Sequence, residues 1–258
     1  MRKEQINNNN NSLDDNKSSS LDEISIRKQF FDHYKNNPLP DDQVLENIGL
    51  FLNTKNLSRI LFMNFIYQKI LDIQGVVIEF GTRWGQNISL FSALRGIYEP
   101  YNIQRKIIAF DTFEGFPSIS SKDGEDNCIK TGNLNVTKNY ENYLDVIMDF
   151  QEKDNPVSHI KKYVIRKGDA VIELKKYLED NPQTIVSMVF FDLDLYEPTK
   201  ICLQLIKPHL VKGSLLAFDQ LCTDNFPGET IALKETFNLN EIKLHRYPFA
   251  TRLSYFTL

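Results

Sequence analysis

The sequence predicts an α/β protein with a doubly wound, mostly parallel β-sheet. From residue 75 to the C-terminus, strand-like and helix-like segments alternate, and repeated strand–helix units are typical of a parallel sheet with helices on both faces. Residues 185–191 form an almost continuous apolar run, as expected for a central strand that is buried on both faces. Ligands of such sheets bind at the carboxyl ends of the strands, so the residues that follow each strand are the candidates for a functional site.

Hydrophobic periodicity predicts seven strands and five helices in this part of the chain. The expected strands are 76–80, 106–110, 163–166, 185–191, 214–218, 242–247 and 252–257. The expected helices are 86–98, 138–151, 170–178, 198–209 and 229–237. A long irregular region, residues 111–136, follows the second strand, and we expect it to act as a lid over a bound ligand.

The chain divides into three regions. Residues 1–22 are rich in Asn, Ser and Asp and offer too little apolar surface to offset the entropy of ordering, so we expect a disordered tail. Residues 23–74 have a helical pattern that is broken near Pro38 and Pro40, which predicts an N-terminal helical extension. Residues 75–258 form the α/β domain, and a chain of 258 residues has room for one domain of this size.

The composition excludes several classes of protein. The formal net charge of −4 and the pI near 5.7 argue against a protein that binds the phosphate backbone of nucleic acids. No apolar run reaches the roughly 18 residues of a membrane span, and the polar N-terminus does not look like a secretory signal. The three cysteines are widely spaced, which indicates reduced thiols and neither a disulfide framework nor a zinc site. We therefore expect a soluble, cytoplasmic protein without a nucleic-acid or membrane partner.

The first candidate site is the turn after strand 76–80. Residues Glu79–Asn87 read EFGTRWGQN, so two glycines lie four residues apart where a helix is expected to begin. Glycine allows a tight turn and a close approach of a ligand to the backbone, and the free N–H groups of a helix start bind anionic groups. The motif is neither Gly-x-Gly-x-x-Gly nor a phosphate loop. An ordinary junction between a strand and a helix explains it equally well.

Acidic residues follow the next two strands. Asp111 ends the second strand, where its carboxylate can accept hydrogen bonds from both ribose hydroxyls of a nucleoside. Asp169 follows the third strand, within Gly168–Ala170, where an adenine edge would rest. Asp169 also suits the N-cap of the next helix, and the two roles are compatible. Together with the glycine turn, these residues favour a cofactor that contains adenosine.

The fourth and fifth strands also end in acidic residues. Asp192 and Asp219 each end a strongly apolar strand, and Gln220 follows Asp219. Carboxylate and amide oxygens at neighbouring strand ends suit Mg²⁺, which lowers the pKa of a bound hydroxyl. Of Asp192 and Asp194, we expect Asp192, the first residue after the strand, to be the metal ligand and the base. A purely structural role for both strand-end carboxylates is the alternative.

These motifs, in this order, resemble those of the macrocin O-methyltransferase family. The resemblance rests on ExGxxxG at 79–85, DTFEGFP at 111–117, GDA at 168–170, DLDLYEPT at 192–199 and FDQ at 218–220. Within the family, the chain resembles the dTDP-6-deoxy-hexose 3-O-methyltransferases most. The resemblance covers residues 75–258 and implies a class I, Rossmann-like methyltransferase fold with a seven-stranded sheet and an antiparallel last strand.

The resemblance implies transfer of a methyl group from S-adenosylmethionine to a sugar hydroxyl, in a nucleotide-linked deoxysugar, with assistance from Mg²⁺. The implied cofactor residues are Glu79, Gly81, Thr82, Arg83, Gly85, Gln86, Asn87, Asp111, Thr112, Phe113, Gly168, Asp169, Ala170 and Asp192. The implied metal ligands are Asp192, Asp219 and Gln220. Many family members have a second Asp where this chain has Gln220, and a neutral ligand weakens the case for a metal. The candidates for contacts with the acceptor are Tyr196, Glu229, Arg246 and Arg252, since a diphosphate requires cations such as these arginines.

Two other functions fit the same residues. An O-methyltransferase of a phenolic or glycosylated natural product would use a flat apolar slot in place of arginines. A non-catalytic homologue would keep the cofactor pocket and lack a complete metal site, as Gln220 hints. The acceptor, the hydroxyl that is methylated and the oligomeric state stay open. The helical extension suits either a cover over the active site or the contact surface of a homo-oligomer.

Overall fold

The computed structural model describes residues 20–258, so the predicted tail, residues 1–22, lies almost entirely outside the described part. The helical extension begins two residues earlier than predicted, with α1 (Leu21–Lys35). Ser20 caps this helix, because its hydroxyl accepts a hydrogen bond from the backbone N–H of Glu23 at 3.2 Å. The Glu23 carboxylate in turn accepts one from the backbone N–H of Ser20 at 2.8 Å. This capping box satisfies two backbone donors at the helix start and explains where the helix begins.

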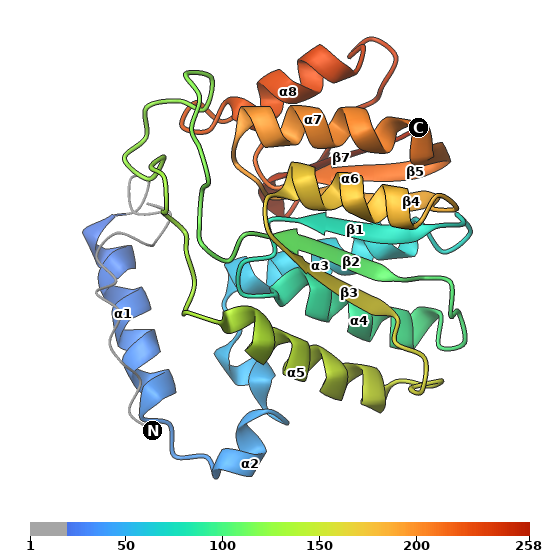
Figure 1. Cartoon of the computed structure of the whole chain (residues 1–258). Coiled ribbons are helices and arrows are strands. Elements are labelled where there is room, and N and C mark those ends of the chain that lie inside the picture. The colour runs from blue at the N-terminus through green and yellow to red at the C-terminus, as the bar shows by residue number, and fades with distance from the viewer. Residues whose placement is uncertain (1–19) are drawn as a thin grey trace.

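The described residues form a seven-stranded sheet with the order β3-β2-β1-β4-β5-β7-β6 (Figure 1). The strands are β1 (Val76–Phe80), β2 (Ile107–Asp111), β3 (Tyr163–Lys167), β4 (Val186–Phe191), β5 (Leu210–Phe218), β6 (His245–Tyr247) and β7 (Ala250–Thr257). Strands β1 to β5 are parallel, and β7 is antiparallel to both β5 and β6. The predicted α/β class, parallel sheet and antiparallel last strand are confirmed. The strand order reverses between β1 and β4, and such a reversal opens a ligand crevice at the carboxyl ends of the two strands.

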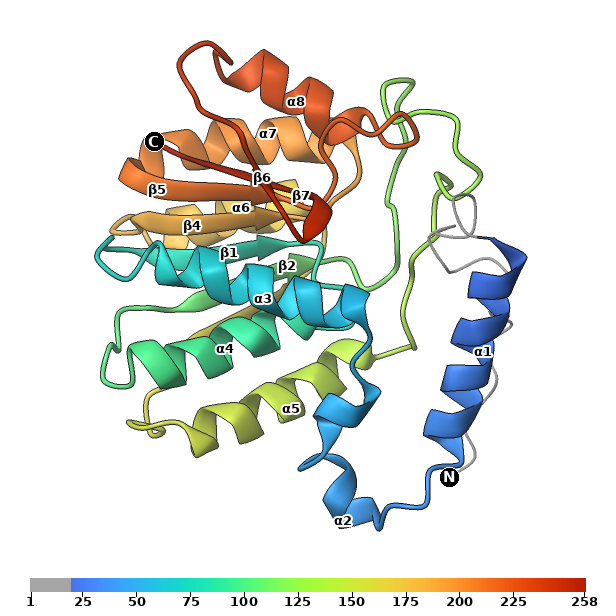
Figure 2. The same cartoon turned by 180° about the vertical axis from the view of Figure 1, so that it is seen from behind.

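Helices cover both faces of this sheet (Figures 1 and 2). One face carries α3 (Thr54–Gln68), α4 (Gln86–Tyr98) and α5 (Tyr140–Asp154), and the other carries α6 (Ala170–Asp180), α7 (Tyr196–Ile206) and α8 (Gly228–Thr236). Alternate residues of a central strand serve the two faces. Val77 packs in the core formed with α3 and α4, whereas Ile78 packs in the core formed with α6 and α7. Burial on both faces is the reason that residues 185–191 are continuously apolar.

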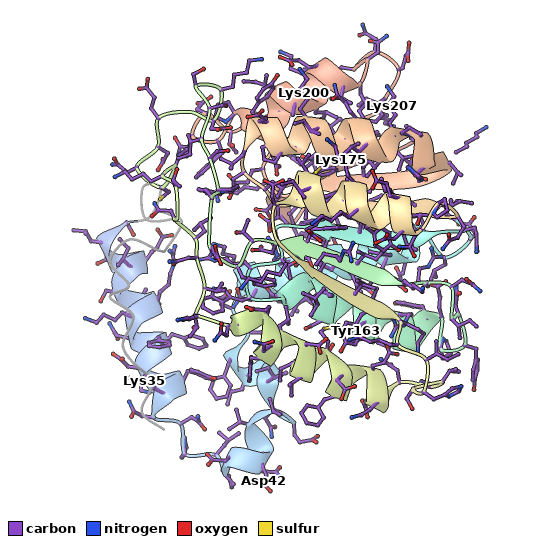
Figure 3. All side chains as sticks on the ribbon, viewed as in Figure 1. Lys35, Asp42, Tyr163, Lys175, Lys200 and Lys207 are labelled. Atoms are coloured by element: carbon purple, nitrogen blue, oxygen red, sulfur yellow. The ribbon has the colours of Figure 1, made fainter. Side chains whose placement is uncertain are left out.

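The N-terminal elements stand apart from the sheet. After α1 come α2 (Asp41–Val44) and the 3₁₀ helix η3 (Ile48–Phe51). Helix α1 has no buried residue and lies beside the edge of the domain, on neither face of the sheet (Figures 1 and 2). Figure 3 marks Lys35 at the end of α1 and Asp42 in α2, both away from the sheet. Across residues 20–258, every helix is too short or too polar to cross a membrane.

Several predicted boundaries differ from the observed ones. The predicted helix 198–209 is α7 followed by the 3₁₀ helix η4 (Lys207–His209). Pro208 lies in the first turn of η4 and lacks the backbone N–H that an α-helix would need there. Strand β5 begins four residues earlier than predicted, at Leu210. Its first residues are not buried, so the apolar pattern does not mark them.

A buried arginine joins the elements at the amino end of the sheet. Arg105 precedes β2 and is 2% exposed. Its guanidinium donates to the carbonyl oxygens of Gly75 at 2.6 Å, Ile73 at 2.8 Å and Ile70 at 2.9 Å. It also pairs with the carboxylate of Glu99 at 2.9 Å. These bonds fix the chain between α3 and β1, opposite the end where the ligand crevice opens.

Candidate active site

A large cavity opens at the carboxyl ends of the central strands. Its volume is about 1140 Å³. Residues that follow β1, β2, β4 and β5 line it, together with residues of α1, the start of α3 and the start of β7. A pocket for one drug-sized ligand measures roughly 300–1,000 Å³, so this cavity has room for a nucleoside cofactor and for a second molecule beside it.

Most of the predicted site residues meet at this cavity. Those that line it are Gly81, Thr82, Arg83, Gln86, Asn87, Asp111, Thr112, Asp169, Ala170, Asp192, Asp219 and Arg252. The others that were predicted lie outside the described lining; they are Glu79, Gly85, Phe113, Gly168, Tyr196, Gln220, Glu229 and Arg246. The residues predicted from the strand ends are thus partly brought together at one cavity, and their roles stay predictions.

The turn after β1 requires glycine at Gly81. This residue has a φ of +83°, and a Cβ there would lie 1.9 Å from the carbonyl oxygen of Asp192, so a side chain would collide with the backbone after β4. The same turn brings the backbone N–H of Arg83 to 2.7 Å from Asp111 Oδ2. Phe113 N donates to Asp111 Oδ1 at 2.5 Å. Burial raises the pKa of Asp111, and these two bonds oppose the rise. Asp111 thus joins two turns at the cavity, and its contact with a ribose stays a prediction.

Glu79 lies beneath the glycine turn. Its carboxylate is fully buried on the face of the sheet that α3 and α4 cover, and burial raises its pKa to about 7. Thr82 Oγ1 donates to Oε2 at 3.4 Å, whereas Oε1 has no hydrogen-bond partner within residues 20–258. A buried acceptor without a partner costs free energy, so Oε1 is a candidate for a bond with a ligand.

Asp169 caps α6, as its position predicted. Its Oδ1 accepts hydrogen bonds from the backbone N–H groups of Val171 at 2.9 Å and Ile172 at 3.1 Å. Asp169 also lines the cavity, so the capping role does not remove it from the site. Its contact with an adenine stays a prediction.

Two acidic residues follow β4, and both line the cavity. Strand β4 ends at Phe191, so the regular alternation of a strand does not set the directions of Asp192 and Asp194. Asp194 has a φ of +61° and is buried. Burial and the nearby charge of Asp219 raise the pKa of Asp194 to about 7. The same two causes raise the pKa of Asp192 well above its ordinary value.

A cation that the sequence did not reveal lies between these strand ends. Arg59, from α3, donates to Asp192 Oδ2 at 2.8 Å and also to Asp219 Oδ1. Burial alone would lower the pKa of Arg59, but the charges of Asp219 and Asp192 outweigh this and raise it. Arg59 lies 133 residues before Asp192 in the chain, and no local motif connects the two.

The donor set predicted for Mg²⁺ does not fit a metal as it is arranged. Asp192 and Asp219 are both bound to Arg59. The side chain of Gln220 is buried outside the described cavity lining. Within residues 20–258, no three acidic, histidine or cysteine side chains come together in a way that would hold a metal ion. The observed arrangement therefore does not match the predicted magnesium site.

The predicted acceptor residues have different surroundings. Arg252 lines the cavity, whereas Arg246 is exposed on β6, where it pairs with Ser254 of β7. Glu229 is fully buried, and its Oε1 accepts from the backbone N–H groups of Leu193 and Asp194. Burial and the neighbouring charge of Asp194 raise the pKa of Glu229. These contacts indicate that Glu229 stabilises the backbone of the segment after β4.

Tyr196 lies in a surface cluster on α7. Its hydroxyl donates to Glu235 Oε2 at 2.6 Å and accepts from the ammonium groups of Lys122 and Lys200, each at 3.0 Å. Lys122 belongs to the long region between β2 and α5, so this cluster attaches that region to α7 and α8. The side chain of Tyr196 is outside the described lining of the cavity.

The chain is similar to solved structures of methyltransferases. No family model and no curated protein matches the chain. Among solved structures, CalS11, the calicheamicin methyltransferase, is 37% identical, with a TM-score of 0.90 over 93% of each chain. The apo structure of CalS11, described as TDP-rhamnose 3′-O-methyltransferase, is 34% identical, with a TM-score of 0.81 over 93% of this chain and 95% of that one. The O-methyltransferase NovP is 16% identical, with a TM-score of 0.58 over 78% and 79%, and shows the fold alone.

The strand order, the cavity at the switch between β1 and β4 and these matches define the class of protein. It is a class I methyltransferase that uses S-adenosylmethionine. More particularly, the chain belongs to the family of CalS11, a sugar O-methyltransferase. The resemblance seen in the sequence is thereby confirmed.

Proposed function

We propose that this chain transfers the methyl group of S-adenosylmethionine to a hydroxyl of a nucleotide-linked deoxysugar. The observation that carries the proposal is 37% identity over 93% of each chain to CalS11, which is described as a TDP-rhamnose 3′-O-methyltransferase of calicheamicin biosynthesis. The cavity supports it, because its volume accommodates two molecules. Arg83 and Arg252 line this cavity, and guanidinium groups bind the oxygens of a diphosphate.

The residues present fit S-adenosylmethionine. Oε1 of Glu79 is a buried acceptor without a partner in the described structure. The ammonium group of the cofactor needs such an acceptor, and we place it there. Gly81 lets the turn after β1 lie against the backbone of Asp192, and this turn lines the cavity where we place the methionine part of the cofactor. Asp111 lies at the end of β2 and lines the cavity, where we place the ribose hydroxyls. When bound, S-adenosylmethionine supplies a methyl group on a sulfonium sulfur, which the acceptor oxygen takes as the carbon–sulfur bond breaks.

Asp192 is the base in this proposal. A sugar hydroxyl is a weak nucleophile at neutral pH, so its proton has to be taken up as the oxygen attacks the methyl carbon. Burial raises the pKa of Asp192, which strengthens it as a base. Arg59 holds Oδ2 of Asp192, and we assign the proton to Oδ1. The turn after β1 and the walls of the cavity align the two substrates, which supplies much of the acceleration.

The experiment is methyl transfer with purified protein, S-adenosylmethionine and a panel of TDP-deoxysugars, followed by mass spectrometry. We expect the mass of one methyl group to be gained by a sugar nucleotide, together with formation of S-adenosylhomocysteine. A matched panel of catechols and glycosylated phenols tests the alternative acceptor class. Gain of a methyl group in that panel alone would contradict a nucleotide-sugar acceptor. Absence of S-adenosylmethionine binding by calorimetry would contradict the whole proposal.

A further inference from the structure

One side chain fills the place between the two strand-end carboxylates. Arg59 donates from one guanidinium nitrogen to Asp192 and from another to Asp219. Its Nε donates to the side-chain oxygen of Asn87 at 3.2 Å, and its guanidinium lies over the ring of Phe190, 5.6 Å from the centroid. Each of its three nitrogens thus donates one hydrogen bond, to the residue after β4, to the residue after β5 or to Asn87 of α4, and these bonds orient the guanidinium.

Among the described residues, no three acidic, histidine or cysteine side chains are grouped so that they could hold a divalent cation. A hard cation takes about six oxygen ligands, and the two carboxylates at the strand ends already share one positive charge. The third predicted ligand, Gln220, is neutral and 1% exposed, and its Nε2 has no partner among the described residues. Gln220 is also outside the described lining of the cavity.

We propose that Arg59 takes the place of a divalent cation at the ends of β4 and β5, so that methyl transfer by this chain requires no Mg²⁺. Two neighbouring carboxylates repel each other unless a positive charge lies between them. A guanidinium keeps its charge at every physiological pH and matches two carboxylates with separate N–H donors. Arg59 therefore neutralises the pair and orients Asp192. It is a positioning residue, and its role in methyl transfer rests on the function proposed above.

The proposal predicts how Mn²⁺ binds, a property that can be measured without any acceptor. Electron paramagnetic resonance of the full-length protein should show free Mn²⁺ at concentrations up to about ten times that of the protein. In Arg59→Met, which removes the charge and keeps an apolar chain, we expect one Mn²⁺ per chain, bound at least ten times more tightly than in the wild type. The added substitution Asp219→Asn should abolish that binding.

Activity provides the second arm of the test. Wild-type methyl transfer should be unchanged by EDTA, whereas Arg59→Met should lose most activity in EDTA and regain part of it with Mg²⁺. Two results would overturn the proposal. The first is that the wild type binds one Mn²⁺ per chain and that Asp219→Asn removes this binding. The second is that Arg59→Met folds and binds no Mn²⁺. If the binding pattern is as expected and no nucleotide sugar is methylated, the proposed function fails and the assignment of Arg59 stands.

Discussion

At the scale of single residues, the chemistry depends on the carboxylate of Asp192. We expect Asp192→Asn to lower kcat by about 100- to 10,000-fold, the usual contribution of a positioned base. The change keeps the size of the side chain, so the dissociation constant of S-adenosylhomocysteine should stay within a few-fold of the wild-type value. Steady-state kinetics and calorimetry measure the two quantities. Asp224→Asn, in an exposed position of the loop after β5, is the control and should behave as the wild type. Nearly full activity in Asp192→Asn would refute the role of base.

The buried carboxyl of Glu79 should make stability depend on pH. Its pKa is raised from 4.5 to about 7 by burial, so between these values the folded protein holds a proton that the unfolded chain releases. The free energy of unfolding should therefore fall as pH rises from 5 to 7 and level off above that. Glu79→Gln removes this contribution, whereas those of Asp192, Asp194 and Glu229, whose pKa values are also raised, remain in both proteins. The free energy of unfolding of the wild type minus that of Glu79→Gln should change by on the order of 2 kcal/mol between pH 5 and pH 8. Urea denaturation without cofactor measures it. A difference that stays constant across this range would contradict the shifted pKa.

Gly81 and Gly132 form a matched pair for testing the turn after β1. Both have a positive φ, +83° and +80° respectively, but a Cβ at Gly132 would meet nothing within 4 Å. Gly132→Ala should cost only the strain of the left-handed backbone, about 1 kcal/mol. Gly81→Ala adds a collision with the backbone of Asp192. We expect it to destabilise the protein by at least twice as much and to weaken binding of S-adenosylhomocysteine at least tenfold. Equal effects of the two substitutions would show that the close approach is unimportant.

At the scale of elements, buried ionic contacts fix the segments that the sheet does not. Arg105 is bound by three carbonyl groups and by Glu99. Arg105→Met leaves these acceptors buried without a donor, so we expect a loss of about 3–5 kcal/mol in the free energy of unfolding. Lys153→Met breaks an exposed ion pair with Asp149 on α5. This substitution should change the free energy of unfolding by less than about 1 kcal/mol. Chemical denaturation compares the two, and similar losses would contradict a special role for Arg105.

The elements whose patterns are local were the ones that the sequence predicted well. Strand β1 was predicted with its observed bounds, and α4 likewise, because each alternates or repeats apolar residues between clear turn signals. Asp169 was predicted as a cap from its place before α6, and its two backbone bonds confirm this. The acidic residues at the strand ends were predicted to meet because parallel strands end at one edge of a sheet.

Contacts between distant elements were not predictable in the same way. Arg59 belongs to a helix whose sequence pattern indicates only which face is buried, and its two partners lie 133 and 160 residues further along the chain. Glu229 was a candidate for contact with the acceptor, with a structural role as the alternative. Its carboxylate is fully buried and bonds to the backbone after β4, and its contact with an acceptor stays a prediction. A raised pKa through burial is invisible in sequence, since it depends on which neighbours the tertiary structure provides.

At the scale of the whole molecule, one wall of the cavity comes from a helix that contributes no buried residue to the core. Glu23, Ile26 and Arg27 of α1 line the cavity, yet no residue of α1 is buried. We therefore expect deletion of residues 1–36 to leave the melting temperature within a few degrees of the wild-type value, because little apolar surface is lost from the core. The wall of the cavity formed by these residues would be removed.

The same deletion should separate acceptor binding from cofactor binding. The turns after β1 and β2 remain, so the dissociation constant of S-adenosylhomocysteine should be unchanged, whereas KM for the sugar nucleotide should rise at least several-fold. Deletion of residues 1–19 keeps α1 and is the control, with wild-type kinetics expected. Calorimetry and steady-state assays of the two truncated proteins measure these constants. If both deletions leave KM unchanged, α1 takes no part in acceptor binding, and the walls formed by α3 and β7 suffice.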